Sequence, residues 1–217
     1  MTKYNCLSFD GIDDTIETTD DVKLNTPAQT ILLIAEVSKP TNAINFIVNY
    51  NNVAIIVYGT GAIKYELVTA GEDNKEAEGP TLTTTPEKAV IIGYRNSSDV
   101  LKIRYNGTDY GAAVVGDTTR TDAGKKHIGH SDSSLYWGGK VYLFAIWNRQ
   151  LTDAEIDFLE ANPYNPIPNG LVQFFDYSGI GGGSWADNTI NALDGTISGA
   201  TTVSENKVSV RNNANRR

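Results

Sequence analysis

The chain lacks the features that mark several classes of protein. Among its 217 residues it has one cysteine, Cys6, so no disulfide can form within the chain. Residues 4–9 have the pattern of a strand, in which Cys6 is a small buried side chain rather than a reactive thiol. No apolar run approaches the roughly 20 residues that span a bilayer, and no cationic segment followed by an apolar run begins the sequence. We therefore expect a soluble protein made in a cytoplasm, with no membrane insertion.

Positive charge and histidine are also scarce. The formal net charge is −8, whereas a protein that binds a nucleic-acid duplex needs a basic face to displace counterions. We expect no nucleic-acid partner. The two histidines, His127 and His130, do not lie in a nucleophile-elbow context, which argues against a Ser/His/Asp hydrolase.

Helical periodicity is rare, and short β-type runs separated by turn residues fill most of the sequence. The length suits one large domain. Asn106-Gly107 is the strongest hairpin signal, with 100–105 and 109–115 as its two strands. The polar stretch 71–87 is predicted to be a long exposed loop. Further strands are predicted at 30–37, 43–50, 52–58, 62–68, 88–95 and 140–147. This spacing predicts an antiparallel two-sheet sandwich.

Residues 151–163 allow two interpretations. On a strand, Glu155 and Asp157 would share a face, and with Glu160 they would resemble the carboxylate cluster of glycan hydrolases. Thr152 and Glu155, however, form a capping box, and Pro163 ends the segment. We therefore predict a short helix on which the three acids splay apart, with no catalytic residue among them.

Four segments resemble laminin-G-like, concanavalin-A-type jelly rolls. They are residues 7–14, 101–107, 127–129 and 139–156, and the match covers about residues 4–161. The last strand and helix of pentraxins are similar to the last of these segments. The resemblance implies two packed antiparallel sheets. With the helix added, the predicted fold class is all-β: a two-sheet antiparallel jelly-roll sandwich with one short helix.

The chain departs from this family in two ways. Tyr142 stands where the family often has an acidic residue. Residues 170–176 and 194–200 look like segments that usually precede the Phe-Asp-Gly motif, but here they come after the helix. We therefore expect a jelly-roll domain at 1–161 and a C-terminal extension at 162–217. The strand at 170–176 is expected beside the Phe9-Asp10 strand, completing this sandwich or a neighbour's.

Many relatives of this class hold calcium at the rim of the sandwich, which makes a structural calcium ion an expectation although no cofactor is required. Calcium takes six to eight oxygen ligands. Two groups offer them: a turn with Asp10, Asp13 and Asp14, and a loop with Asp187, Asn191 and Asp194. The alternative is that these residues stabilise turns through bonds to their own backbone.

A polar loop at 130–137 ends in two adjacent aromatic residues. We predict that it binds a ligand through four residues: His130, Asp132, Tyr136 and Trp137. Sugar faces stack on such rings, and aromatic pairs also form hot spots between proteins. The alternative is that one ring packs inward, because neighbours on a strand point to opposite faces.

We expect a non-catalytic binding or structural module on the surface of a bacteriophage particle, such as a capsid decoration, a head fibre or a tail appendage. The family usually works outside cells, yet the chain shows neither a signal peptide nor a cysteine framework. A virion protein is made in the host cytoplasm and released by lysis, which resolves this conflict. Its partners would be other virion proteins or a cell-surface glycan. Alternatives are a glycan-processing enzyme of the concanavalin-like glucanase class and a free bacterial lectin domain.

The C-terminal tail is basic, in contrast to the rest of the chain. We expect Arg211, Arg216 and Arg217 to meet the acidic surface of an adjacent subunit in a larger assembly. The alternative is that the tail folds back on its own domain.

Overall fold

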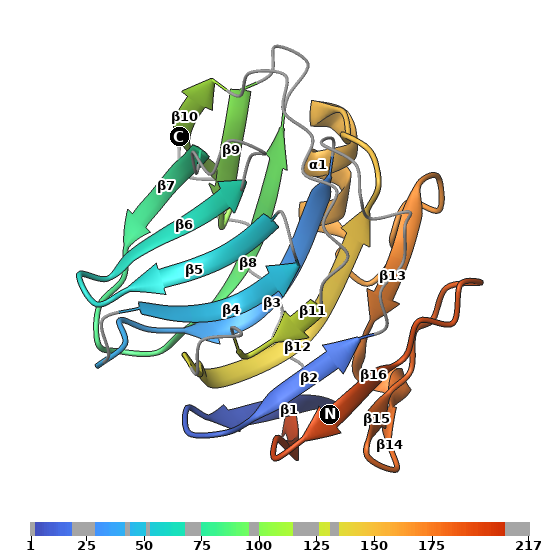
Figure 1. Ribbon diagram of the computed structural model, residues 1–217. Coiled ribbons are helices and arrows are strands. Elements are labelled where there is room, and N and C mark those ends of the chain that lie inside the picture. The colour runs from blue at the N-terminus through green and yellow to red at the C-terminus, as the bar shows by residue number, and fades with distance from the viewer. Residues whose placement is uncertain are drawn as a thin grey trace.

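Two antiparallel sheets pack face to face in the computed structural model (Figure 1). The structure describes residues 3–18, 29–41, 44–50, 53–67, 75–95, 100–114, 126–130 and 135–206. In this part of the chain no helix is long and apolar enough to cross a membrane. The all-β jelly-roll sandwich with one short helix is confirmed.

Sheet A has eight strands, and β12 occupies its middle, pairing with β3, β1 and β13. Seven strands follow in spatial order: β10 (Thr108–Val114), β9 (Val100–Tyr105), β8 (Glu87–Arg95), β3 (Thr30–Val37), β12 (Gly138–Trp147), β1 (Lys3–Asp10) and β17 (Thr201–Asn206). The eighth, β13 (Leu171–Phe175), pairs only with β12.

Sheet B has nine strands and faces the viewer in Figure 1. In spatial order they are β14 (Ile180–Gly181), β15 (Ser184–Trp185), β16 (Gly195–Ser198), β2 (Thr15–Thr18), β11 (Lys126–Ile128), β4 (Ile44–Tyr50), β5 (Val53–Tyr58), β6 (Ala62–Leu67) and β7 (Lys75–Thr81). The described residues also form the helix α1 (Asp153–Ala161) and the one-turn helix η2 (Tyr177–Gly179).

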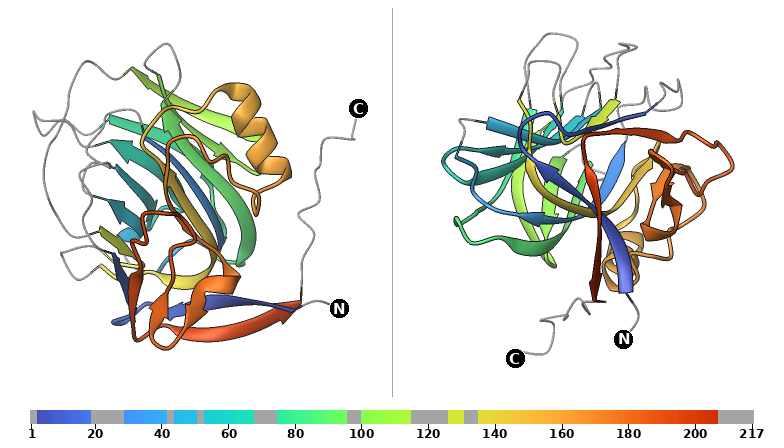
Figure 2. Two further views of the ribbon diagram at one scale, coloured as in Figure 1. Left: turned by 90° about the vertical axis from the view of Figure 1, so that its right-hand side faces the viewer. Right: turned by 90° about the horizontal axis from the view of Figure 1, so that it is seen from below.

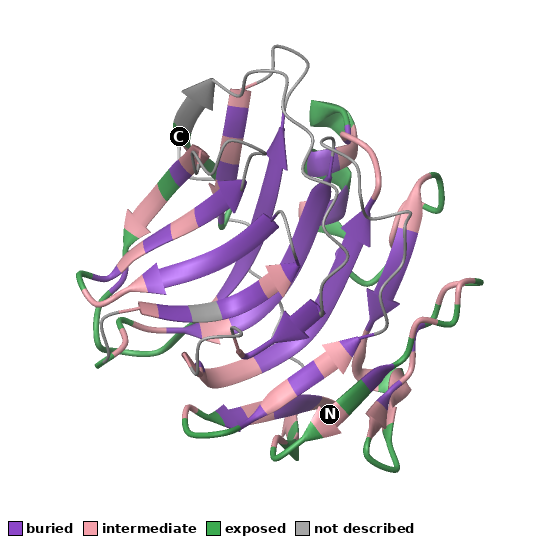
Figure 3. Cartoon of the chain, viewed as in Figure 1, coloured by how far each residue is buried: buried purple, intermediate pink, exposed green. Residues whose placement is uncertain are grey.

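The main core lies between the sheets, and the middle strands are buried along their length (Figure 3). A chain of polar side chains runs through this core. Thr18 and Tyr50 share a hydrogen bond, Tyr50 donates to Gln173, and Gln173 donates to the Leu193 carbonyl. Because each buried polar group has a partner, the network avoids the cost of an unsatisfied one.

A second apolar cluster covers the outer face of sheet A, where α1 packs on the side away from sheet B (Figure 2). Ile156 and Leu159 of α1 contribute to it, together with Leu32 and Ile34 of β3. Sheet A is therefore covered on both faces. This explains why β3 is a continuous apolar run, since only a strand exposed on one face needs polar residues at alternate positions.

The predicted helix is confirmed, and its capping box is present. Thr152 is the N-cap: its hydroxyl accepts from the Glu155 amide at 3.3 Å, and Glu155 accepts from the Thr152 amide at 2.8 Å. The three acids do not all splay apart. Glu155 pairs with Arg149, whereas Asp157 and Glu160, three residues apart on one side of the helix, both pair with Arg104.

Two predictions about local structure have opposite outcomes. The Asn106-Gly107 hairpin is confirmed, since both residues have positive φ (47° and 86°) and Thr108 pairs with Tyr105. The exposed loop predicted at 71–87 is wrong for its middle part. Residues 75–81 form β7, which pairs with β6 at the edge of sheet B. An edge strand is half solvated, so its polar composition concealed it.

The C-terminal strands complete the sheets of the same chain. The strand predicted at 170–176 exists as β13, but it pairs with β12 rather than with the Phe9-Asp10 strand. That position belongs to β17, which pairs along β1 from Lys3↔Asn206 to Ser8↔Thr201 (Figure 2). Glu205 of β17 also accepts hydrogen bonds from Lys140 and Tyr142. The tail arginines Arg211, Arg216 and Arg217 lie outside the described residues.

Candidate functional site

One rim of the sandwich brings together two of the segments that the sequence singled out. The turn between β1 and β2 meets the start of β12, because Asp10 pairs with Gly138. The segment after β11 returns to the same place, where the Trp137 amide donates to the Gly129 carbonyl at 2.8 Å. A Cβ on Gly129 would lie 3.2 Å from the Asp14 carbonyl oxygen, so the two segments are in contact. We call this region the acidic rim, defined by residues 10–14, 129–130 and 135–137.

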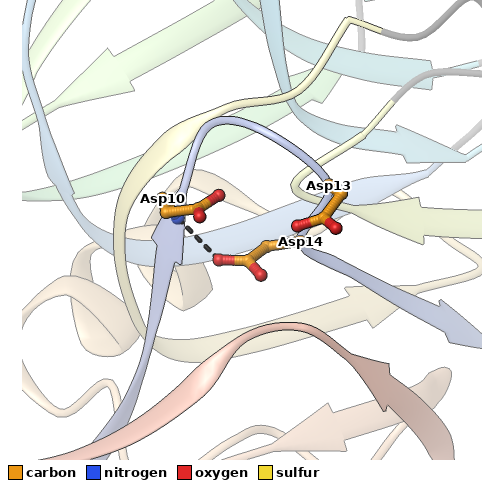
Figure 4. Close-up of side chains that lie close together, drawn as sticks. All are labelled: Asp10, Asp13 and Asp14. Atoms are coloured by element: carbon orange, nitrogen blue, oxygen red, sulfur yellow. Dashed lines mark hydrogen bonds between the residues drawn. The ribbon is translucent and has the colours of Figure 1, made fainter.

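The turn of the acidic rim carries three carboxylates, Asp10, Asp13 and Asp14 (Figure 4). Each offers one oxygen, and these oxygens lie within 4.8 Å of one another. Asp14 is 5% exposed, and its Oδ2 accepts from the Asp10 amide at 2.6 Å. Burial raises the pKa of Asp14, the hydrogen bond from Asp10 opposes this rise, and the charges of Asp10 and Asp13 add to it. This set of hard oxygens suits calcium, so these are the residues that would hold the ion.

Three rings contact one another in sequence next to this turn, and we call them the ring ladder. Tyr136 and His130 stack with centroids 4.4 Å apart and an interplanar angle of 24°. His130 meets His127 edge-on at 5.1 Å. Tyr136 and His130 are half-buried, so part of each ring faces solvent. Asp132, the fourth predicted ligand residue, lies outside the described residues.

The ladder ends on sheet B in a row of polar residues that sequence reasoning missed. His127 pairs with Glu17 on one side and with Asn49 on the other. Because Ile128 lies in the core, alternation places the His127 side chain on the outer face. Glu17 and Asn49 share that face. No signal in the sequence indicates this row, since it depends on the register of three strands that are distant in the chain.

Trp137 does not face a ligand, which corrects the prediction for this residue. Its side chain is 1% exposed and belongs to the main core, with its ring 5.5 Å from that of Phe9. Tyr136 and Trp137 are adjacent on extended backbone and therefore point in opposite directions. The predicted roles of His130, Asp132 and Tyr136 in ligand binding stay predictions.

The residues of the second predicted metal group make several hydrogen bonds to backbone groups, and their role as metal ligands stays a prediction. Both oxygens of Asp187 accept from backbone amides, Oδ1 from Phe174 and Thr189 and Oδ2 from Leu193. Asn191 donates to the Val172 carbonyl, and Asp194 accepts from the Asp187 amide. The loop is therefore held by hydrogen bonds to its own backbone, as the alternative from turn chemistry expects, and to the backbone of β13.

No protein-family model and no curated protein matches the sequence, whereas solved structures match the fold. A protein of Bacteroides ovatus described as a candidate carbohydrate-binding protein superposes with a TM-score of 0.73 at 16% identity. The match covers 97% of this chain and 63% of that one, so this chain spans less than two thirds of it. A heptameric pentraxin of Limulus polyphemus, similar to SAP, has a TM-score of 0.60 at 15% identity, covering 90% of this chain and 96% of that one.

A third match is the CBM40 module of the IT-sialidase of Ruminococcus gnavus, solved with α2,6-sialyllactose. Its TM-score is 0.53 at 13% identity, and the match covers 73% of this chain and 98% of that one. Together these structures confirm the predicted laminin-G-like, concanavalin-A-type jelly roll. At such low identity the likeness shows the fold alone.

Proposed function

We propose that the protein is a non-catalytic glycan-binding module and that the acidic rim is its binding site. The observation that carries this proposal is the stacked pair of Tyr136 and His130, half-buried and in a segment that touches a turn of carboxylates. A sugar presents an apolar C–H face, which packs on a ring, and hydroxyl groups, which hydrogen-bond to carboxylates. Few other classes of ligand need an aromatic ring and hydrogen-bonding carboxylates in the same site.

The charge of the rim favours an uncharged glycan. Asp10 and Asp13 are exposed, Asp14 lies beneath them, and Glu17 lies beside the inner end of the ring ladder. When no cation is bound to these carboxylates, a sialylated or sulfated chain would bring further negative charge to them at a cost in free energy. Neutral hexose polymers avoid this repulsion.

Two of the matched structures support a carbohydrate ligand by analogy of fold. One is described as a candidate carbohydrate-binding protein, and the other is a carbohydrate-binding module bound to a sialylated sugar. The analogy extends to the class of ligand and not to its charge, because the acidic rim opposes an anionic sugar.

A catalytic role is less well supported, because the acidic residues of α1 form ion pairs. The acids that resembled a hydrolase cluster are paired with arginines: Glu155 with Arg149, and both Asp157 and Glu160 with Arg104. They neutralise cations on the outer side of sheet A. Nothing in their arrangement places one carboxylate as a nucleophile opposite another as an acid.

Replacing Tyr136 tests the proposal. We expect Tyr136→Ala to weaken binding of a neutral oligosaccharide by about tenfold or more, because one stacked ring contributes on the order of 1 kcal/mol or more. The measurement is isothermal titration with neutral hexasaccharides selected on a glycan array. Phe158→Ala is the matched control, since Phe158 is an exposed ring (42% exposed) on α1, away from the rim. Equal affinity of both variants and the unaltered protein would disprove the rim as the site.

Location on a virion surface rests on the sequence alone and stays a prediction. Mass spectrometry of purified phage particles, with the chain present or absent among their proteins, decides it.

A further inference from the structure

Three tyrosines from separate parts of the chain meet on the outer side of sheet A, and we call them the tyrosine cluster. Tyr4 comes from β1, Tyr164 from the segment after α1, and Tyr177 from η2. The rings of Tyr4 and Tyr164 are nearly parallel, 6.0 Å apart at 21°. Tyr177 meets Tyr4 edge-on at 4.2 Å and Tyr164 at 5.8 Å. Tyr164 is 37% exposed, so the cluster presents ring surface to solvent.

The cluster is built from rigid pieces. Tyr4 lies on a strand that is hydrogen-bonded on its outer edge to β17, where it pairs with Glu205. Side chains on β1 point alternately to the two faces of sheet A. Leu7 points into the main core, so Tyr4, three positions earlier, points to the outer face, as Cys6 does. Tyr177 opens η2, whose N-cap Asp176 accepts from the Ser178 amide at 2.8 Å. The three rings are therefore positioned before any ligand arrives, which lowers the entropic cost of binding.

Polar groups line one edge of the cluster. Oδ1 of Asp176 accepts from Ser178 and from the Asn188 side-chain amide at 2.9 Å, and these bonds fix the carboxylate. Its Oδ2 has no hydrogen-bond partner among the residues that the structure describes. Asp176 lies close enough to Tyr164 that its charge acts on the phenol. Burial and the neighbouring Tyr4 and Asp176 raise the pKa of Tyr164 to about 12, so its hydroxyl stays protonated at neutral pH.

We propose that the tyrosine cluster is a second glycan-binding site, in which a pyranose ring stacks on Tyr164 and its hydroxyls bond to Oδ2 of Asp176 and to the tyrosine hydroxyls. This inference rests on the proposed glycan-binding function and adds a site that is separate from the acidic rim. The rim includes Asp10, at the end of β1, whereas the cluster includes Tyr4, near the start of the same strand.

The composition of the cluster favours a sugar over a protein partner. Its three rings are all tyrosines, and Tyr177 lies between Asp176 and Ser178, which both accept hydrogen bonds from Asn188. Flat amphipathic rings beside fixed hydrogen-bonding groups match a ligand that is a hydroxyl-rich ring. Two sites on one chain would also bind one polysaccharide at two points, which increases the overall affinity without a new contact.

The test separates the two sites by replacing one ring in each. Neutral hexasaccharides of glucose, mannose and galactose are titrated into the full chain, and binding is followed by calorimetry and by chemical shifts of the backbone amides. We expect two sites in the unaltered protein and one each in Tyr164→Ala and Tyr136→Ala. The affinity of the affected site should fall by about tenfold or more. Tyr164→Phe, which keeps the ring, should retain the second site, and melting curves verify that each variant is folded.

The outcomes distinguish failure of one proposed site from failure of the other. A second site that survives in Tyr164→Ala overturns the tyrosine cluster as a site, and a first site that survives in Tyr136→Ala overturns the acidic rim. Absence of binding by the unaltered protein at millimolar hexasaccharide overturns both. If sedimentation shows a dimer that Tyr164→Ala converts to a monomer, the cluster is an interface between two copies and the proposal is wrong.

Discussion

Tyr136 and Trp137 are adjacent residues in very different environments. The ring of Tyr136 stacks on His130 at the acidic rim, whereas the ring of Trp137 lies between the sheets against Phe9. Extended backbone sends successive side chains to opposite faces, so one aromatic residue lies at the proposed site and the other lies in the core. The two residues therefore have separable effects on binding and stability.

Replacing Trp137 tests this division. We expect Trp137→Ala to lower the free energy of unfolding by about 3–5 kcal/mol, because it leaves a cavity in a close-packed core. Tyr136→Ala should lower it far less. Urea unfolding followed by circular dichroism gives both values. A Trp137→Ala protein as stable as the unaltered one would show that Trp137 is not a core residue.

At the scale of the element, α1 shows how local signals place a helix and tertiary contacts hold it. Its N-terminus is fixed by the Thr152–Glu155 capping box. Arg149 then holds both oxygens of Glu155, with Nη1 at 2.9 Å and Nη2 at 2.6 Å. The Arg149 guanidinium and the hydrogen bonds from Thr152 together outweigh burial and lower the pKa of Glu155 to about 2.

This lowered pKa predicts how the helix responds to acid. Because the pKa falls on folding, the ionised carboxylate stabilises the protein above its usual pKa of 4.5, and this stabilisation is lost as the pH falls toward 2. Glu155→Gln should cost roughly 1 kcal/mol at neutral pH, since the pair is partly solvated and solvent screens it. Urea unfolding at a series of pH values should show the two proteins converging as the pH approaches 2. A difference that stays constant with pH would assign the cost to the cap and not to the charge.

The whole molecule depends on its C-terminal strands. β16 extends sheet B beyond β2, while β13 and β17 extend sheet A beside β12 and β1. Phe175 of β13 and Trp185 of β15 stack at 5.1 Å, and both are fully buried in the main core. The region that resembles the jelly-roll family is therefore incomplete without the segment that follows it.

Truncation at two positions tests this dependence. We expect a chain of residues 1–161 to lack cooperative unfolding, because it loses those core rings and leaves β1 and β2 without an outer neighbour. A chain of residues 1–206 keeps every described element and serves as the control, which should melt as the full chain does. Dispersion of amide proton shifts and the sharpness of thermal melting are the measurements. Cooperative melting of the shorter chain would make residues 1–161 an independent domain.

The sequence by itself determined the features that depend on neighbours along the chain. The Asn106-Gly107 hairpin requires positive φ at two successive positions, and the α1 capping box joins residues three apart. Alternation predicted β9, and apolar runs predicted β3 and β12. Each of these signals acts within a few residues, which is why it can be recognised in one sequence.

Only the tertiary structure decided which distant residues meet. A period of two shows that Tyr136 and Trp137 point to opposite faces, but it does not show which face is the core. The row of Glu17, His127 and Asn49 follows from the register of three strands, and the tyrosine cluster follows from where β1, the segment after α1 and η2 pack. Strand order and register are set by the burial of the whole core, so no local pattern contains them.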